Sequence, residues 1–281
     1  PPHDSGIMSE VQAVTDYNDV KTMDKDEAVK QGLCVIIGKD IDDKYIACLK
    51  EQVKHPEAIK AMAKDLKIVY TPLHGTGNIP ARRVLKELGF ENVYVVPEQE
   101  LPDGEFPTVG YPNPEAEEAF VLGLKLAKEV DADLVLATDP DADRLGVRVK
   151  DKNGEYHTLT GNMSGCLLAE YTIGQMNALN GGLPEDGALI KTIVTTNMAD
   201  AVAKHYGIRL IECLTGFKYI GQQILGFETS GKGTYLFGFE ESYGYLAGPY
   251  VRDKDAIIGS MLICEMAAYY RSIGSSLKQR L

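Results

Sequence analysis

From residue 67 onward, short apolar runs alternate with longer segments that carry apolar residues at helical spacing. The apolar runs predict strands at 67–73, 92–98, 132–138, 188–196, 208–215 and 233–242. The intervening segments predict helices at 79–89, 115–130, 162–179, 198–207 and 255–277. This alternation is typical of α/β layers with mainly parallel sheets. Binding and catalytic residues of such sheets lie in loops beyond the carboxyl ends of the strands.

The alternating region divides into two similar units. A hairpin is expected at 144–160, because Asn153 and Gly154 form the dipeptide of a tight turn. The second unit begins directly after this hairpin. We therefore expect two similar three-layer α/β domains with mainly parallel mixed sheets, one over residues 56–160 and one over residues 161–281.

Residues 1–31 differ from the rest, because they are polar, with a weak helical pattern and several helix breakers. The short apolar run at 33–38 predicts a strand. Apolar residues at helical spacing over 42–66, interrupted near Pro56, predict two helices or one helix and a connector. The sequence opens at Pro1 without an initiator methionine, which indicates a piece of a longer protein or a processed start.

Composition excludes several classes of protein. The formal net charge is −12 and the pI is near 4.9, whereas general nucleic-acid binders and proteins that bind anionic membranes need a basic face. The sequence has no apolar span of membrane length and no secretory signal pattern. The cysteines are odd in number and widely spaced, which fits buried thiols in a reducing cytosol. They are Cys34, Cys48, Cys166, Cys213 and Cys264.

Three aspartates at alternate positions follow the apolar run 132–138. They are Asp139, Asp141 and Asp143, and Arg144 comes directly after them. Converging carboxylates do not all stay ionised without a cation, and hard oxygen ligands favour Mg²⁺ or Ca²⁺. The spacing also begins like an EF-hand loop, but that loop needs glycine where Arg144 stands and glutamate where Lys150 stands. We predict a metal site at the three aspartates, with Arg144 placed to hold a phosphate beside the metal.

Two further loops carry candidate polar residues. The stretch GFEESYG offers Glu240 and Ser242, whose oxygens suit sugar hydroxyls that both donate and accept hydrogen bonds. Lys218 in TGFKYIG follows a predicted strand, where a lysine can reach a phosphate as a point charge. Taken alone, GFEESYG is more typical of a polar loop or helix cap, and Lys218 is more typical of a solvated surface lysine.

Two glycine-rich stretches resemble nucleotide motifs only in part. Residues 71–89 form a strand, glycine turn and helix, but Pro80 replaces the third glycine of the dinucleotide fingerprint. We expect a phosphate-binding or interdomain loop there, and His74 is either structural or lines the cleft. Residues 226–234 nearly match a P-loop, but Gly233 stands where the hydroxyl is needed, so we predict a hairpin turn.

Several of these stretches together resemble the α-D-phosphohexomutases, the family that includes phosphoglucomutases and phosphomannomutases. The resemblance rests on TPLHGTG (71–77), PDGEFP (102–107), PNPE (112–115), ATDPDADRLGV (137–147), TGFKYIG (215–221) and GFEESYGY (238–245). Their order and spacing match the family from about residue 60 to the end. The form of the last motif is similar to the phosphoglucomutase branch, which includes relatives acting on pentose phosphates.

The resemblance implies a fold of four domains around a deep cleft and a reaction through a phosphoserine and a sugar bisphosphate. It implies that Asp139, Asp141 and Asp143 bind Mg²⁺ and that Arg144 lies close to them in the cleft. Glu240 and Ser242 would hold sugar hydroxyls, and Lys218 would face the substrate. The parent enzyme would convert glucose 1-phosphate and glucose 6-phosphate into each other in the cytoplasm, without nucleic-acid or membrane partners.

The sequence departs from the family in two places. The phosphoserine motif T-x-S-H-N-P and the C-terminal phosphate loop R-x-S-G-T-E-P are both absent. Residues 1–55 are similar to the end of the family's first domain, so the chain resembles a central fragment with domains two and three. We expect such a fragment alone to be inactive, because domains one and four of the parent chain are missing.

Three alternatives stay open at this point. One is that the parent is a phosphomannomutase or a phosphopentomutase rather than a phosphoglucomutase. A second is that the chain is a truncated, non-catalytic module that binds sugar phosphates. A dinucleotide-dependent oxidoreductase is a third possibility, which rests on the glycine turn at 71–89 alone.

Overall fold

A computed structural model describes residues 2–280 of the chain. The chain separates into two compact units, Pro1–Lys44 and Tyr45–Leu281. Among residues 2–280, no helix combines the length and the apolar character needed to cross a bilayer.

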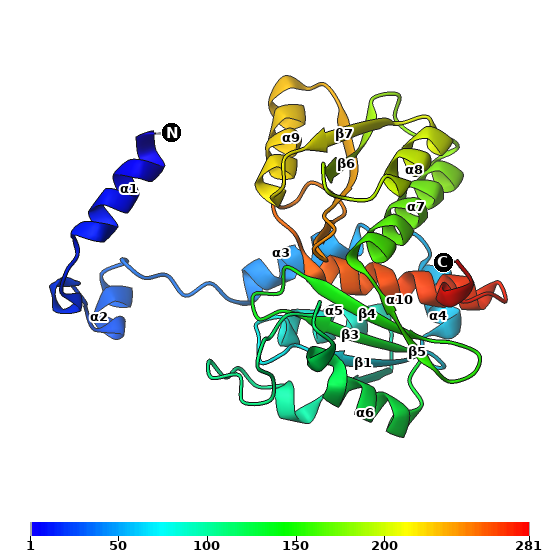
Figure 1. Cartoon of the computed structure of the whole chain (residues 1–281), viewed down its shortest axis with the longest axis horizontal. Coiled ribbons are helices and arrows are strands. Elements are labelled where there is room, and N and C mark those ends of the chain that lie inside the picture. Colours follow the sequence, from blue (N-terminus) through cyan, green and yellow to red (C-terminus); the bar gives the residue numbers. More distant parts are fainter. Residues whose placement is uncertain (1, 281) are drawn as a thin grey trace. The chain divides into compact units, whose positions relative to one another are not determined.

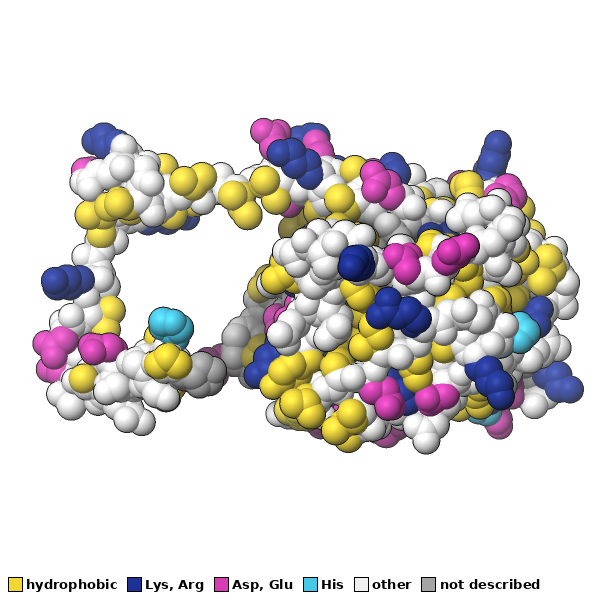
Figure 2. Space-filling model, turned by 90° about the horizontal axis from the view of Figure 1, so that it is seen from above, with side chains coloured by type: hydrophobic (Ala, Val, Ile, Leu, Met, Phe, Trp, Pro, Cys, Tyr) yellow, Lys and Arg dark blue, Asp and Glu magenta, His cyan; other side chains and the backbone are white. Residues whose placement is uncertain are grey.

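The first unit is built from short helices. They are α1 (Pro2–Ala13), η1 (Tyr17–Asp19), α2 (Lys25–Lys30) and the beginning of α3 (Lys39–Lys50). None of its described residues is buried, and Figure 2 shows its apolar side chains open to solvent. The strand predicted at 33–38 is wrong, because these residues have no regular structure, and Ile36 and Ile37 are 65% and 70% exposed. A strand needs a partner strand for its backbone groups, and the described residues supply none here.

The second unit contains two sheets (Figure 1). The first has the strand order β2-β1-β3-β4-β5, in which β2, β1 and β3 are parallel and β4 runs antiparallel to both of its neighbours, β3 and β5. Its strands are β1 (Lys67–Thr71), β2 (Asn92–Val95), β3 (Leu134–Thr138), β4 (Leu145–Lys150) and β5 (Tyr156–Leu159). Its helices and short helical turns are α4 (Pro56–Met62), α5 (Asn78–Leu88), η2 (Pro97–Gln99), η3 (Glu117–Phe120) and α6 (Val121–Val130).

The second sheet repeats this plan with the order β7-β6-β8-β9, in which only β9 is antiparallel. Its strands are β6 (Gly187–Thr192), β7 (Arg209–Cys213), β8 (Thr234–Phe239) and β9 (Tyr245–Leu246). Its helices are α7 (Gly161–Asn180), α8 (Met198–Tyr206) and α9 (Phe217–Ser230). The prediction of two α/β domains with mainly parallel mixed sheets is confirmed.

Helix α10 (Ala256–Ser272) packs against β4 of the first sheet and β9 of the second, and Figure 1 shows it crossing the middle of this unit. It is almost entirely buried, which explains why its sequence is apolar on every side. As predicted, Asp255 caps it, since the carboxylate accepts hydrogen bonds from the N–H groups of Ile257 and Ile258 at 2.7 and 3.1 Å. The short η4 (Leu277–Arg280) follows.

Two local predictions are wrong. Helix α9 was not predicted, although it contains the beginning, up to Ser230, of the stretch at 226–234 that partly matches a P-loop. The turn at 231–233 joins this helix to a strand, whereas the predicted hairpin turn would join two strands. The helix expected at 115–130 begins as the 3-10 turn η3 and becomes α-helical only at Val121.

Candidate functional site

The three aspartates lie on one tight loop after β3. Asp139 is buried, and its Oδ1 accepts hydrogen bonds from the N–H groups of Asp143 and Arg144 at 3.0 and 2.9 Å. Asp141 is exposed and Asp143 is half-buried. One carboxylate oxygen from each of the three lies within 4.8 Å of the others. The loop therefore gathers the three side chains at one point, as the alternate spacing predicted.

Close packing shapes this loop. Gly75 of the glycine turn leaves no room for a side chain, because a Cβ there would lie 2.3 Å from the Cα of Pro140. The N–H of Thr76 donates to the carbonyl of Pro140 at 2.8 Å. Ala142 takes the left-handed conformation, with φ of 59°, which turns the chain between the second and third aspartates. The glycine turn thus serves as a brace for the aspartate loop.

The electrostatics of the loop favour a cation. Burial raises the pKa of Asp139 to about 7, and the neighbouring carboxylates of Asp143 and Asp141 add to the rise. A divalent ion bound there would stabilise the ionised carboxylates and so offset this rise in pKa. Oxygens bound to one Mg²⁺ at ~2.1 Å lie at most about 4.2 Å apart, so a small closure of the loop suffices. The donor set therefore fits Mg²⁺.

Arg144 lies beside the aspartates, as expected. Its Nε is 3.8 Å from an oxygen of Asp139 and 3.8 Å from one of Asp143, and its Nη1 donates to Glu115 at 3.1 Å. Glu115 belongs to the PNPE stretch. Together with the aspartate loop, that stretch lines a small cavity of about 240 Å³. Arg144 also lines this cavity, with a half-buried side chain.

Glu240 lies in the loop between β8 and β9. It is buried, and burial raises the pKa of its carboxyl group. Its Oε1 accepts a hydrogen bond from the N–H of Gly216 at 3.1 Å, which ties this loop to the TGFKYIG loop. Ser242 is half-buried in the same loop, and Tyr243 beside it has a positive φ of 65°.

Backbone contacts join this loop to the aspartate loop. The N–H of Leu145 donates to the carbonyl of Tyr243 at 3.0 Å, and Arg144 forms an isolated antiparallel bridge with Gly244. The N–H of Ala256, at the start of α10, donates to the carbonyl of Ala142 at 3.0 Å. The two loops predicted from sequence therefore meet, although nearly a hundred residues separate them.

Lys218 is less well placed than its neighbours. It stands in the first turn of α9 and is exposed, with its Nζ 5.1 Å from the centre of the Tyr219 ring. No hydrogen bond or ion pair to the candidate carboxylates is recorded for it among residues 2–280. Besides Arg144, Lys254 also reaches the aspartates, since its Nζ lies 2.8 Å from Oδ2 of Asp143.

Sequence reasoning missed Lys254. Its stem crosses Gly244, where an added Cβ would lie 2.3 Å from Cδ of the lysine. Its Nζ also pairs with Asp253 at 2.8 Å. A lysine directly before the predicted helix cap Asp255 was the available signal, because residues at the start of a helix that follows a binding loop often face that loop.

His74 is a structural residue. Its ring nitrogens lie 3.1 Å from the carbonyl oxygen of Leu101 and 2.8 Å from the hydroxyl of Thr108. It is buried and has a positive φ of 61°. The histidine thus holds the proline-rich loop onto the glycine turn.

A second acidic group lies elsewhere, in the hairpin between β4 and β5. It consists of Asp151, Glu155 and His157. Asp151 already has partners: His157 at 2.9 Å and the N–H groups of Asn153 and Glu155. These contacts, led by His157, lower the pKa of Asp151 to about 2. They account for this group as a turn-stabilising network.

Comparison with known proteins matches each of the two sheet-containing halves of the second unit to a family model. Residues 43–154 match the model of phosphoglucomutase/phosphomannomutase alpha/beta/alpha domain II, and residues 160–281 match that of domain III. This chain belongs to the phosphoglucomutase/phosphomannomutase family. The resemblance found in the sequence motifs is thereby confirmed.

Related enzymes are similar over most of this chain. A phosphoglucomutase of Staphylococcus epidermidis is 41% identical over 217 residues, which are 77% of this chain and 38% of the relative. A probable phosphomannomutase of Haemophilus influenzae is 38% identical over 244 residues, or 86% of this chain and 46% of the relative. The chain thus spans less than half the length of these relatives.

Solved structures show the same fold. A putative phosphomannomutase from Thermus thermophilus superposes with a TM-score of 0.66 at 23% identity, covering 85% of this chain and 49% of that one. An N-acetylphosphoglucosamine mutase of Aspergillus fumigatus superposes with a TM-score of 0.53 at 14% identity, covering 82% and 48%.

Proposed function

We propose that this chain carries the metal-binding and sugar-binding parts of a phosphoglucomutase-type enzyme that interconverts hexose 1-phosphate and hexose 6-phosphate. The observation that supports this most is the junction of the two loops: an aspartate cluster suited to Mg²⁺ lies against a loop rich in sugar-binding groups. Family membership adds the reaction class. We assign residues 56–160 and 161–281 to family domains two and three, and residues 1–55 to the end of domain one.

Asp139, Asp141 and Asp143 would hold the Mg²⁺ ion. When bound, the ion would supply positive charge that stabilises a phosphoryl group in transfer. Arg144 lines the same cavity beside them with a half-buried side chain, and it would hold phosphate oxygens. Its contact with Glu115 fixes the side chain at the mouth of the small cavity.

Glu240 and Ser242 would bind sugar hydroxyls, and Lys218 would contact the substrate from the neighbouring loop. Glu240 already has one carboxylate oxygen fixed by the N–H of Gly216, so its other oxygen is oriented in advance. A sugar bisphosphate that turns between two half-reactions needs contacts away from both phosphates. Ring hydroxyls held by these two residues would meet that need.

The sugar is proposed as glucose, with mannose and pentose phosphates as alternatives. The GFEESYG form of the loop favours the phosphoglucomutase branch, whereas the Haemophilus relative carries the name of a probable phosphomannomutase. We place the enzyme in the cytosol, because the five cysteines are free thiols in the structure.

The chain alone is proposed to be inactive, since its sequence has no Ser-His-Asn motif to carry the phosphoryl group. The test is to mix the pure chain, Mg²⁺ and glucose 1,6-bisphosphate, the ligand of the Aspergillus mutase structure, and to follow binding by NMR. We expect weak binding that Glu240→Ala and Ser242→Ala both reduce, and no conversion of glucose 1-phosphate.

Glu185→Ala is the matched control, because Glu185 is an exposed acid before β6. Binding that this variant reduces as much as Glu240→Ala would contradict the assigned sugar loop. Turnover of glucose 1-phosphate by the pure chain would contradict the proposed dependence on the absent serine.

A further inference from the structure

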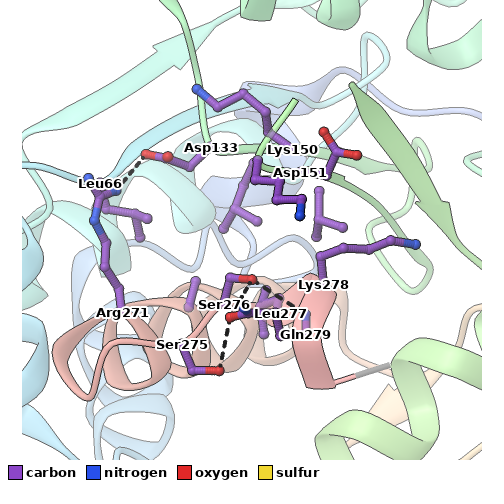
Figure 3. Close-up of a pocket in the computed structure, with 14 residues that line it drawn as sticks. Leu66, Asp133, Lys150, Asp151, Arg271, Ser275, Ser276, Leu277, Lys278 and Gln279 are labelled. Carbon is purple, nitrogen blue, oxygen red and sulfur yellow. Dashed lines mark hydrogen bonds and ion pairs between the residues drawn. The ribbon is translucent and has the colours of Figure 1, made fainter. Parts of the chain in front are cut away.

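A larger cavity, of about 610 Å³, lies away from the site described above (Figure 3). Its apolar wall is formed by buried residues of the first sheet, α10 and the end of the chain. They are Leu66, Leu134, Val149, Ala267 and Leu277. Cavities of this volume with an apolar wall and a few polar groups are typical of small-molecule sites.

The polar rim of this cavity is mainly basic. Lys150, Lys152, Arg271 and Lys278 line it, against Asp133 and Asp151. Figure 3 shows Arg271 and Asp133 facing each other at one end, with Lys278 at the other end and Ser275 and Ser276 along one side. A basic rim is unusual on a chain whose net charge is −12.

Both carboxylates of the rim already have partners. Asp133 pairs with Arg271 at 3.0 Å and accepts from the N–H of Lys67 at 2.9 Å. Asp151 is held by His157 and two backbone N–H groups in its hairpin. Asp133 is therefore paired with a cation, whereas Asp151 is anchored within its hairpin and makes no ion pair with a rim lysine among residues 2–280.

Two of the lysines have no such partner. Lys150 pairs with Asp131 at 2.8 Å. No ion pair is recorded for Lys152 or Lys278 among residues 2–280, and Lys278 is half-buried at the cavity. The hydroxyls of Ser275 and Ser276 both donate to Oε1 of Gln279 at 3.3 Å, so the donors left for a ligand are the two lysines.

The cavity is separate from the aspartate loop. It includes Asp133 and Leu134, at the amino end of β3, whereas Asp139 follows the carboxyl end. Six residues of extended chain between Asp133 and Asp139 span roughly 20 Å. A ligand in the cavity would therefore not contact the metal-binding or sugar-binding residues.

We propose that this cavity is a second ligand site for a small organic phosphate with an apolar body. Lys152 and Lys278 bind the phosphate, and the apolar wall covers the body of the ligand. Lysine ammonium groups suit a phosphate dianion. Ordinary hexose phosphates are disfavoured, because sugar hydroxyls would lie against Leu134 and Val149 without partners.

The test uses the full chain with phenyl phosphate as the probe, in buffer containing EDTA at pH 7.5, and follows amide shifts by NMR. We expect shifts at Leu277 and Val149, and a loss of affinity of at least tenfold in both Lys152→Glu and Lys278→Glu. Lys232→Glu, a change at an exposed lysine beyond α9, should leave binding unchanged.

Further variants distinguish failure of this second site from failure of the proposed function. Asp141→Asn should not affect phenyl phosphate binding, whereas Ser276→Trp should block it. Absence of binding to the wild-type chain, equal weakening by Lys232→Glu, or loss of binding in Asp141→Asn would overturn the second site. Circular dichroism of each variant confirms that a lost signal does not come from unfolding.

Discussion

Asp139 is the residue in which structure and chemistry are most closely linked. It is buried among carboxylates, yet it organises the loop by accepting two backbone hydrogen bonds. Its folded pKa of about 7 lies above the unfolded value of 3.8. The native state therefore binds a proton more tightly than the unfolded state, and the contribution of this group to stability falls as pH rises from about 4 to 7.

This gives a pH-dependent prediction for Asp139→Asn in metal-free protein. The variant should come closest to the wild type near pH 3, where the carboxyl is mostly protonated in both states. At pH 8 it should be more stable, by on the order of 4 kcal/mol. Urea unfolding at both pH values measures the difference, and a gap that does not change with pH would contradict the account.

Gly75 supports a second prediction at the residue scale. Gly75→Ala should push Pro140 and destabilise the chain by about 1–3 kcal/mol, because the added Cβ meets backbone that has little room to move. Gly226→Ala is the control, since this glycine lies within α9 with open space around it. That change should raise stability by about 0.5–1 kcal/mol. A thermal shift of the same sign in both variants would contradict the brace.

At the scale of elements, Glu265 ties α10 to its surroundings. The side chain is fully buried, and its Oε1 accepts hydrogen bonds from the N–H groups of Lys54 and His55 and from the hydroxyl of Tyr171. These bonds oppose the rise in its pKa caused by burial. The residue thus joins the start of α4 and the middle of α7 to α10.

Glu265→Ala should therefore cost at least about 3 kcal/mol of unfolding free energy, because three buried donors lose their acceptor. Tyr171→Phe removes only one of the three bonds and should cost roughly 1 kcal/mol. Urea unfolding monitored by circular dichroism compares the two. Equal losses would show that Glu265 acts by filling space rather than by accepting these bonds.

Much of the fold was predictable at this scale. Strands such as Leu134–Thr138 are apolar throughout and bounded by polar turns, so periodicity located them. Helix α9 was not predicted, because its glycines and the partial P-loop match at its C-terminal end both suggested a turn. The apolar run at 33–38 was misleading, because a strand depends on a partner that these residues do not find within their own unit.

The candidate site was predictable in part for a related reason. The aspartates and Glu240 follow strands directly, so sheet topology indicated where they would lie. Lys254 pairs with Asp143 although the two residues are far apart in the sequence, and Glu115 of the proline-rich loop pairs with Arg144. Contacts of this kind depend on how distant loops fold onto one another, which no local pattern encodes.

At the scale of the whole molecule, the two units differ in how they are stabilised. The described residues up to Lys44 bury nothing, whereas the core lies within Tyr45–Leu281. Deletion of residues 1–38 should therefore change the melting temperature by less than ~2 °C, since no buried apolar area is lost. Differential scanning calorimetry provides the comparison, and a fall of more than ~5 °C would contradict this independence.

Asp139, Asp141 and Asp143 are proposed to form the divalent-metal site of this family member. Titration with Mn²⁺, followed by electron paramagnetic resonance, tests it most directly. Asp141 is exposed and Asp151 belongs to the other acidic group, so they provide a matched pair of variants. We predict weak binding that Asp141→Asn abolishes and Asp151→Asn leaves intact. Binding that survives Asp141→Asn and is lost in Asp151→Asn would contradict the account.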